Sequence, residues 1–384
     1  AAERARLRSL REPRVVPDPL LWLPTSVGAL VTGQLEELLD VLERLEKLVG
    51  RRAALELAAK ALAGVAVTGL DPDEIIRIAL AVAQPDRVDS ATVGHFRDTL
   101  VSCQRTEDTL GPKAVMRTVR AQLDSARELL LGGVPDIYRA PLLQYVADAA
   151  AVLGGYYVDH TCHPLAERCF RYSRMAAHYA GAPASGAYAA GLLTLSHLLA
   201  GNRIEAHDSA HVTLGLAAQS SDSRLQAFTH QMAAEAAAIN RDHYDCLKQH
   251  DLAMKLITQA GEPTDCPWYW VSAGWFSSKL LDCLLALDRP HDARHLLESD
   301  FPRIDPQYVT LNGFFWVRHV RVWVAVKEID QAARELADVV PVAHLAPRLA
   351  HGVTGARILM DPWQQLPSVR ELDSLLHYHG LPPA

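Results

Sequence analysis

The sequence lacks the features that mark several large classes of protein. Its 6 cysteines show no C-x-x-C spacing, so they are typical of buried thiols in a reducing compartment rather than of a disulfide framework. No apolar run approaches the roughly 18 residues of a membrane span. Residues 1–16 lack a following apolar segment with a cleavage site, so we expect no secretory signal there. We therefore expect a cytoplasmic protein with no membrane partner.

Motifs for catalysis are also missing. The sequence contains no G-x-S-x-G, no H-E-x-x-H, no P-loop and no strand-associated G-x-G-x-x-G. We accordingly predict that the chain is not an enzyme and needs no cofactor. A net charge of −7 does not favour a nucleic-acid-binding body. No window alternates polar and apolar residues for long enough to predict a strand, so the expected fold class is all-α.

Helical patterns and helix breakers alternate along the whole chain. Asp71 and Pro72 form an N-cap followed by a proline at the first helical position, and they predict a helix to about Ala83. The other helices expected before the middle of the chain are 30–64, with leucines in helical spacing over 34–49, then Asp89 or Ser90 to about Thr109, and 113–131.

Small or apolar residues near the start of every second helix recur at a nearly constant interval. The intervals are 40, 41, 46 and 39 residues, and the positions are Ala166, Ala206, Leu247, Ala293 and Ala332. A fixed period in this range is typical of a solenoid of stacked hairpins, which offers a curved binding surface. Small residues at these positions let the two helices of a hairpin approach closely.

The first repeat carries a family resemblance. Leu153-Gly154, Tyr157, Ala166 and Phe170 follow the L-G-x-x-Y…A-x-x-x-F spacing, which resembles a tetratricopeptide repeat, here with a period of about 40. We predict an all-α, tetratricopeptide-like helical-hairpin solenoid preceded by an irregular helical N-terminal region. The expected parts are an arm or linker at 1–24, an N-terminal helical region at 25–134, the repeat array at 135–340 and a C-terminal cap at 341–384. Within the cap, 341–367 should be irregular and Ser368–His377 a short helix.

A second resemblance concerns function. The segments that carry it are Gly69–Glu74 (GLDPDE), Arg87–Val93 (RVDSATV), Asp108–Pro112 (DTLGP) and Val119–Leu123 (VRAQL). They are similar to actinobacterial regulators in which a Cro/repressor-type helix-turn-helix domain precedes a helical-repeat sensor. The sequence shows no helix-turn-helix, since the helical pair at 30–64 has no basic recognition helix.

The resemblance implies a ligand-sensing and dimerisation region of a cytoplasmic transcriptional regulator. It would form a homodimer and reach DNA only through a domain outside this chain. The alternative is a free-standing scaffold that binds a protein or a peptide. An enzyme without a recognisable motif is the least favoured possibility.

The tetratricopeptide resemblance also implies a ligand groove lined by the first helix of each hairpin. A small molecule or a short peptide would bind there. The candidate groove residues are Asp148, Tyr188, Thr229, Asn240, Trp275, Ser278, Asp282, Phe314 and Arg321, with Asp159 projected inward beside them. Five tryptophans lie between 268 and 323, and they fit either packing between hairpins or an aromatic pocket in this groove.

One cluster has the composition of a metal site. His160, Cys162 and His163 lie together, with Asp159 before them and Cys169 after them. A structural zinc ion needs four converging ligands, and a second closely spaced pair is missing. We therefore predict ordinary packing and turn chemistry here, and no metal.

Overall fold

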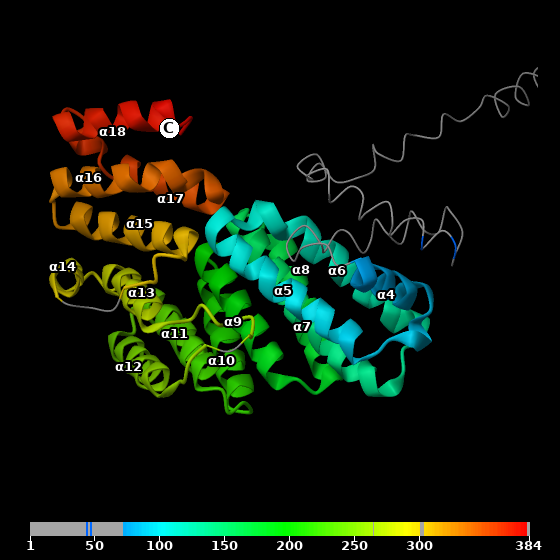
Figure 1. Ribbon diagram of the computed structural model, residues 1–384. Helices are drawn as coiled ribbons and strands as arrows, with labels where there is room; N and C mark the ends of the chain where they lie inside the picture. The colour runs from blue at the N-terminus through cyan, green and yellow to red at the C-terminus, as the bar shows by residue number, and fades with distance from the viewer. Residues whose placement is uncertain (1–43, 45–46, 48–71, 264, 300–302, 382–384) are drawn as a thin grey trace, which may run out of the picture. The chain divides into compact units, whose positions relative to one another are not determined.

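The computed structural model describes residues 44, 47, 72–263, 265–299 and 303–381 (Figure 1). Two compact units make up the chain, residues 1–83 and residues 84–384. The arm expected at 1–24 lies outside the described residues, as does the leucine-rich helix at 34–49 apart from Arg44 and Lys47. In the first unit, α4 (Pro72–Ala83) has the bounds that its Asp-Pro start predicts.

The described part of the second unit consists of helices and turns, with no strand among its residues, which confirms the all-α prediction. Short 3-10 helices cover Pro85–Arg87, Val340–Leu345 and Asp361–Trp363. The α-helices are α5 (Ser90–Leu110), α6 (Pro112–Gly132), α7 (Asp136–Asp159), α8 (His163–Ala180), α9 (Pro183–Leu199), α10 (Arg203–Ala217), α11 (Ser223–Ile239), α12 (His243–Gln259), α13 (Ala273–Ala286), α14 (Pro290–Glu298), α15 (Val309–Ala325), α16 (Ile329–Val339), α17 (Pro347–Ile358) and α18 (Pro367–Tyr378).

Five helix pairs are joined by the same three-residue turn. The pairs are α7/α8, α9/α10, α11/α12, α13/α14 and α15/α16, and the helices of each pair pack on one another. The middle turn residue is left-handed every time, at Thr161, Gly201, Arg241, Asp288 and Lys327, with φ of 58°, 76°, 62°, 60° and 66°. The following N–H bonds the carbonyl five residues back at 2.8–3.0 Å. This is the Schellman arrangement, which satisfies carbonyls at the end of the first helix.

The second helix of each pair buries a small residue near its start. Ala166, Ala206, Ala293 and Ala332 are fully buried, as their spacing predicts. In α12 the buried residue is Cys246, whereas Leu247 is only partly buried, so the predicted position was wrong by one residue. Cys246 follows its left-handed turn by the same number of residues as Ala206, and a thiol is small enough for close helix approach.

The C-terminal segment contains more helix than the sequence indicates. Residues 341–367 were expected to be irregular, but α17 (Pro347–Ile358) occupies nearly half of them. Its proline stands at the first helical turn, where the missing N–H has no partner to lose. Leu349 and Val353 of α17 are fully buried in a core shared with α15 and α16. The short C-terminal helix is confirmed as α18 (Pro367–Tyr378).

Two elements outside the five pairs approach the first helices of the pairs. Within the second unit, α5 packs against α7 and α15, and α17 packs against α7 and α15 (Figure 1). Asp89 caps α5, since its Oδ1 accepts hydrogen bonds from the Thr92 N–H and the Thr92 hydroxyl, both at 2.7 Å. The packing on α7 and α15 places α5 and α17 where they line the pocket described next.

Candidate functional site

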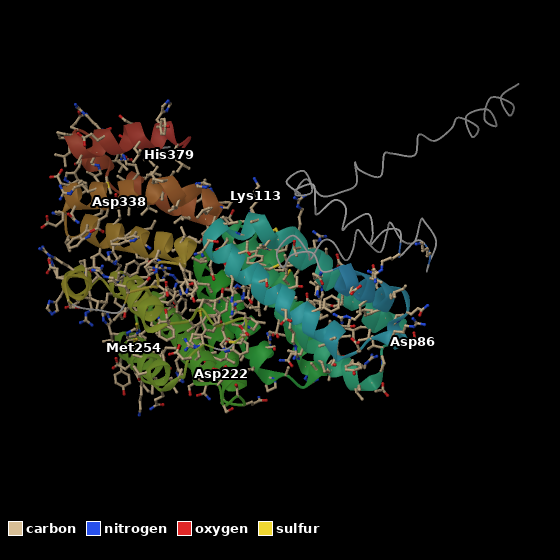
Figure 2. All side chains as sticks on the ribbon, viewed as in Figure 1. Asp86, Lys113, Asp222, Met254, Asp338 and His379 are labelled. Atoms are coloured by element: carbon tan, nitrogen blue, oxygen red, sulfur yellow. The ribbon has the colours of Figure 1, made fainter. Side chains whose placement is uncertain are left out.

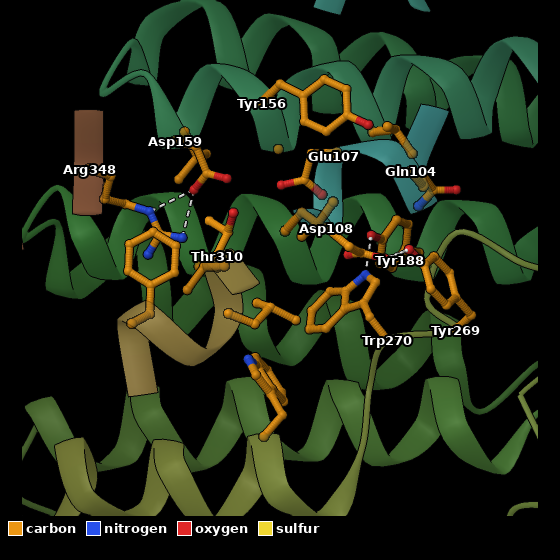
Figure 3. Close-up of a pocket in the computed structure, with 18 of the residues that line it drawn as sticks. Gln104, Glu107, Asp108, Tyr156, Asp159, Tyr188, Tyr269, Trp270, Thr310 and Arg348 are labelled. Atoms are coloured by element: carbon orange, nitrogen blue, oxygen red, sulfur yellow. Dashed lines mark hydrogen bonds and ion pairs between the residues drawn. The ribbon is translucent and has the colours of Figure 1, made fainter. Parts of the chain in front are cut away.

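The second unit holds a cavity of about 120 Å³ between α5 and the first helices of four pairs (Figure 3). Residues of α7, α9, α13 and α15 line one side of it. Residues of α5, α17 and the connection between α12 and α13 line the other. A cavity of roughly 150 Å³ holds one benzene molecule. This pocket is somewhat smaller, so it suits a small molecule or one end of a larger one.

The connection between α12 and α13, residues 260–272, is held from two directions. On one side, Trp268 donates a hydrogen bond from Nε1 to Oδ2 of Asp222 at 2.7 Å. Asp222, which is labelled in Figure 2, is the N-cap of α11. On the other side, Gln104 of α5 donates from Nε2 to the Pro267 carbonyl at 3.0 Å. The connection therefore bridges α5 and α11.

Two aromatic residues of this connection enter the pocket. The Tyr269 hydroxyl donates a hydrogen bond to Asp108 of α5. Trp270 donates from Nε1 to the Tyr188 hydroxyl at 3.3 Å, and its ring centroid lies 5.1 Å from that of Trp275 in an edge-on arrangement. Aromatic pairs in this geometry stabilise each other by about 0.5–1.5 kcal/mol beyond their burial. The pocket thus has a preformed aromatic wall.

Each basic side chain that lines the pocket is engaged by a carboxylate of the same chain. The closest distances are 2.6 Å for Arg348–Asp159, 2.7 Å for Lys279–Glu235 and 2.6 Å for Arg318–Asp282. The Arg348 guanidinium also lies 3.7 Å from the centroid of the Phe314 ring. Each positive charge of the lining therefore already has a carboxylate partner, and Asp282 is shared with Arg321 outside the lining.

Two adjacent acids of α5, Glu107 and Asp108, form no ion pair with a basic side chain of the described residues. Within the described part of the chain, the Glu107 carboxylate has no hydrogen-bond or ion-pair partner, and Asp108 is bonded by Tyr269. Burial raises the pKa of Glu107 well above its usual range, and the nearby Asp159 and Asp108 raise it further, against the opposing charge of Arg348. Burial also raises the pKa of Asp108 to about 7, against the hydrogen bond from Tyr269.

Two buried hydroxyls at the pocket have no partner among the described residues. They belong to Tyr156, which is 4 % exposed, and to Thr310, which is 2 % exposed. Figure 3 shows the Thr310 hydroxyl and the Glu107 carboxylate directed into the same space. An unsatisfied buried hydroxyl costs about 1–3 kcal/mol, so such groups usually meet a water or a ligand.

Three of the nine candidate groove residues line this pocket: Tyr188, Trp275 and Phe314. Asp159 lines it as well. Three others lie beside it, because Ser278 and Asp282 hold Arg318 at 3.2 and 2.6 Å, and Arg321 bonds Asp282 at 2.9 Å.

The other candidates lie away from the pocket. Thr229 bonds the Gln226 carbonyl at 2.8 Å, and Asn240 bonds the Ala236 carbonyl at 3.0 Å, so both turn back onto α11. Asp148 lies in α7 with its Oδ1 buried and unpaired among the described residues.

The tryptophan cluster divides between the two interpretations given to it. Trp270 and Trp275 line the pocket. Trp268 packs against Tyr188 with ring centroids 5.5 Å apart. Trp316 and Trp323 pack against the C-terminal core. Two of the five tryptophans therefore help to form the pocket, and the other three contribute to packing.

Sequence reasoning missed most of the polar residues of the pocket. These are Gln104, Glu107, Asp108, Tyr156, Tyr269, Lys279, Thr310, Arg318 and Arg348. One signal pointed toward Tyr269 and Trp270: the longest repeat interval, 46 residues, contains the connection that carries them. No comparable signal marks α5 or α17, because neither belongs to the repeat.

The residues with metal-site composition make ordinary polar contacts. His163 Nδ1 lies 3.1 Å from the Ser196 hydroxyl, and the Cys162 thiol lies 3.4 Å from the His160 carbonyl. No three His, Cys, Asp or Glu side chains converge to hold a metal ion anywhere in the described ranges.

None of the described helices is both long and apolar enough to span a membrane. No protein-family model matches the sequence, and a search of curated proteins gives no significant match.

Proposed function

We propose that residues 84–384 form a small-molecule sensor whose ligand binds in the pocket between α5 and the first helices of the pairs. The observation that carries this proposal is the pocket itself: its lining combines an aromatic wall with the buried hydroxyls of Tyr156 and Thr310, which have no partner among the described residues. Natural ligand sites combine apolar walls with a few convergent polar groups in the same way.

The five helix pairs support a tetratricopeptide-like solenoid as the frame of this sensor. Their shared left-handed turn and buried small residues repeat at intervals close to 40 residues, except where the pocket-forming connection is inserted. A stacked array of this kind presents its first helices as one continuous surface. The proposed ligand would lie on that surface, under α5.

A regulatory role follows from the resemblance to helix-turn-helix regulators with helical-repeat sensors. The ligand would contact α5, α17 and the repeats at once, so it would favour the arrangement in which these elements close on it. Such a bias would be transmitted to a DNA-binding domain outside this chain, and in a homodimer it would change the spacing of two such domains.

The alternative is a scaffold for proteins or peptides. The first helices α7, α9, α13 and α15 meet α5, Tyr269, Trp270 and Arg348 across the pocket. This covering leaves a cavity of about 120 Å³ there, which suits a compact ligand better than an extended peptide. We therefore place the small-molecule sensor first.

Native mass spectrometry of the protein purified from its own host tests the binding proposal. We expect a bound small molecule in the unmodified protein, and its loss or clear depletion in Tyr156→Phe, which removes only the pocket hydroxyl. Tyr145→Phe is the matched control, because Tyr145 lies on the same helix, is equally buried and has an unpaired hydroxyl, yet does not line the pocket.

A protein that carries no small molecule, and that a broad compound panel fails to stabilise thermally, would contradict the binding proposal. The regulatory part is tested separately by chromatin immunoprecipitation of the full-length gene product in its host. Enrichment of specific promoters is the expected result, and a scaffold would enrich none.

A further inference from the structure

We propose that the ligand of this pocket is a small organic amine, bound as its ammonium cation with an N–H directed at the Glu107 carboxylate. This inference rests on the pocket being the ligand site proposed above. It adds the charge and the hydrogen-bonding groups of the molecule that binds.

The balance of charge in the lining is the first reason. Arg348, Lys279 and Arg318 are each held by a carboxylate at 2.6–2.7 Å, so none of them is available to receive an anionic ligand. Glu107 has no partner of this kind among the described residues, and Asp108 is bonded by a neutral hydroxyl. Glu107 is therefore the group of the lining that can supply an unpaired negative charge once it gives up its proton, and that charge complements a cation.

The aromatic wall is the second reason. Ring faces attract cations, and aromatic cages of this composition are a common way to bind organic ammonium groups. The chain already uses the effect at this site, since Arg348 lies over Phe314 at 3.7 Å and Lys279 Nζ lies 5.8 Å from the Trp275 centroid. Trp270 lines the same cavity with no such cation of the chain placed over it in the described structure.

The unpaired hydroxyls give the third reason. Thr310 and Tyr156 supply buried oxygens that can accept an N–H, and Figure 3 shows Thr310 of α15 facing Glu107 of α5 across the space. An ammonium with two or three N–H groups has donors for several such acceptors at once. A quaternary ammonium would satisfy none of these oxygens, so a primary or secondary amine fits better.

The inference also predicts proton release. Glu107 lies near the charged groups Asp108 on its own helix, Asp159 on α7 and Arg348 on α17. The titratable hydroxyls near it belong to Tyr156 on α7, Tyr188 on α9 and Tyr269 in the connection. Burial and the two aspartates raise the pKa of Glu107, so its carboxyl favours the protonated form in the empty pocket. A bound ammonium would reverse that preference, and the proton from Glu107 would pass to the buffer.

Calorimetric titration of the full chain with matched probes tests the proposal. The probes are benzylamine, cyclohexylamine and isopentylamine, each with the alcohol and the carboxylic acid that carry the same hydrocarbon group. We expect at least one amine to bind at least tenfold more tightly than its alcohol, with no binding of the acids. Titration in phosphate and in MES, which both buffer at pH 6 and are not primary or secondary amines, should show release of close to one proton per amine at that pH.

Variants connect the measurement to the site. Glu107→Gln should weaken amine binding at least tenfold and abolish proton release, and Trp270→Leu should weaken it without abolishing the release. Asp148→Asn, which removes a carboxyl of α7 that does not line the pocket, should leave both unchanged.

Failure of the amine assignment can be distinguished from failure of the pocket as a ligand site. Equal or tighter binding of alcohols or acids, still sensitive to Trp270→Leu, would overturn the cation assignment and leave the pocket as a ligand site. Binding by none of the probes would overturn the amine assignment, and the host-purified protein would then decide whether the pocket binds any small molecule. Amine binding that survives Glu107→Gln would overturn the role given to this carboxylate.

Discussion

Arg348 of α17 joins Asp159 at the end of α7, with Nη2 and Oδ1 2.6 Å apart across 189 residues of sequence. Both side chains are largely buried, at 21 % and 15 % exposure. Removing one partner of such a pair leaves a poorly solvated charge, which commonly costs a few kcal/mol. We predict that Arg348→Met lowers the free energy of unfolding by about 2–3 kcal/mol, measured by urea denaturation.

The matched control for Arg348 is Arg294, whose pairs with Glu298 and Glu328 are exposed. Arg294→Met should change stability far less than Arg348→Met, because exposed pairs contribute little. Adding Asp159→Asn to Arg348→Met should recover part of the loss. Equal costs for the two arginine substitutions would show that the Arg348–Asp159 pair does not connect α17 to α7 in solution.

Two glycines should respond in opposite ways to substitution by alanine, because one lies where two first helices approach closely and the other is exposed. A Cβ on Gly191 of α9 would lie 2.3 Å from the buried ring of Phe228 in α11, whereas a Cβ on exposed Gly215 of α10 would meet nothing within 4 Å. We expect Gly191→Ala to destabilise by about 2–3 kcal/mol through overpacking. Gly215→Ala should stabilise by up to about 1 kcal/mol through helix propensity. Thermal unfolding of both variants measures the difference, and a harmless Gly191→Ala would contradict this packing.

The carboxyl of Asp148 should make the free energy of unfolding depend on pH. Burial raises the pKa of its carboxyl to about 7 in the folded chain, against smaller opposing effects of Ser185 and Arg97. The folded state then binds more protons than the unfolded state between about pH 4 and 7, so the contribution of Asp148 becomes destabilising as the pH rises through that window.

Asp148→Asn should therefore be more stable than the parent chain at pH 8, by ~1–2 kcal/mol once solvent screening is allowed for, and equally stable at pH 4. The measurement is urea unfolding at both pH values. Asp338→Asn, at an exposed aspartate of α16, is the control and should shift stability little at either pH. A gain for Asp148→Asn that does not depend on pH would refute the titration of this group.

Local patterns predicted local structure well in this chain. The Asp-Pro start of α4, the cap of α5 and the hairpin positions follow from capping groups, breakers and helical spacing, which act within a few residues. The tetratricopeptide resemblance projected Tyr188, Trp275 and Phe314 into a groove, and these three line the pocket because they lie on first helices of the pairs. The error at Leu247 also has a local cause, since a small cysteine next to it takes the buried position.

The rest of the pocket depends on contacts between distant segments. Glu107 reaches the pocket because α5 packs on α7 and α15, and Arg348 reaches it because a proline-rich segment forms α17. Neither element shares the repeat period, so alignment on the repeat could not project its side chains into the groove. Such packing is set by the summed burial of many residues, which no short motif encodes.

Filling the pocket from within tests the central claim most directly. Gly155 of α7 lines the pocket, and a Cβ added there would meet nothing within 4 Å, so Gly155→Leu should fold normally and occupy the ligand space. The decisive measurement is the thermal shift that benzylamine, or the molecule recovered from the host, gives in this variant and in the control Gly215→Leu outside the pocket. Our account predicts that the shift disappears in Gly155→Leu and persists in Gly215→Leu. A shift of normal size in Gly155→Leu would contradict it, because the ligand would then bind elsewhere.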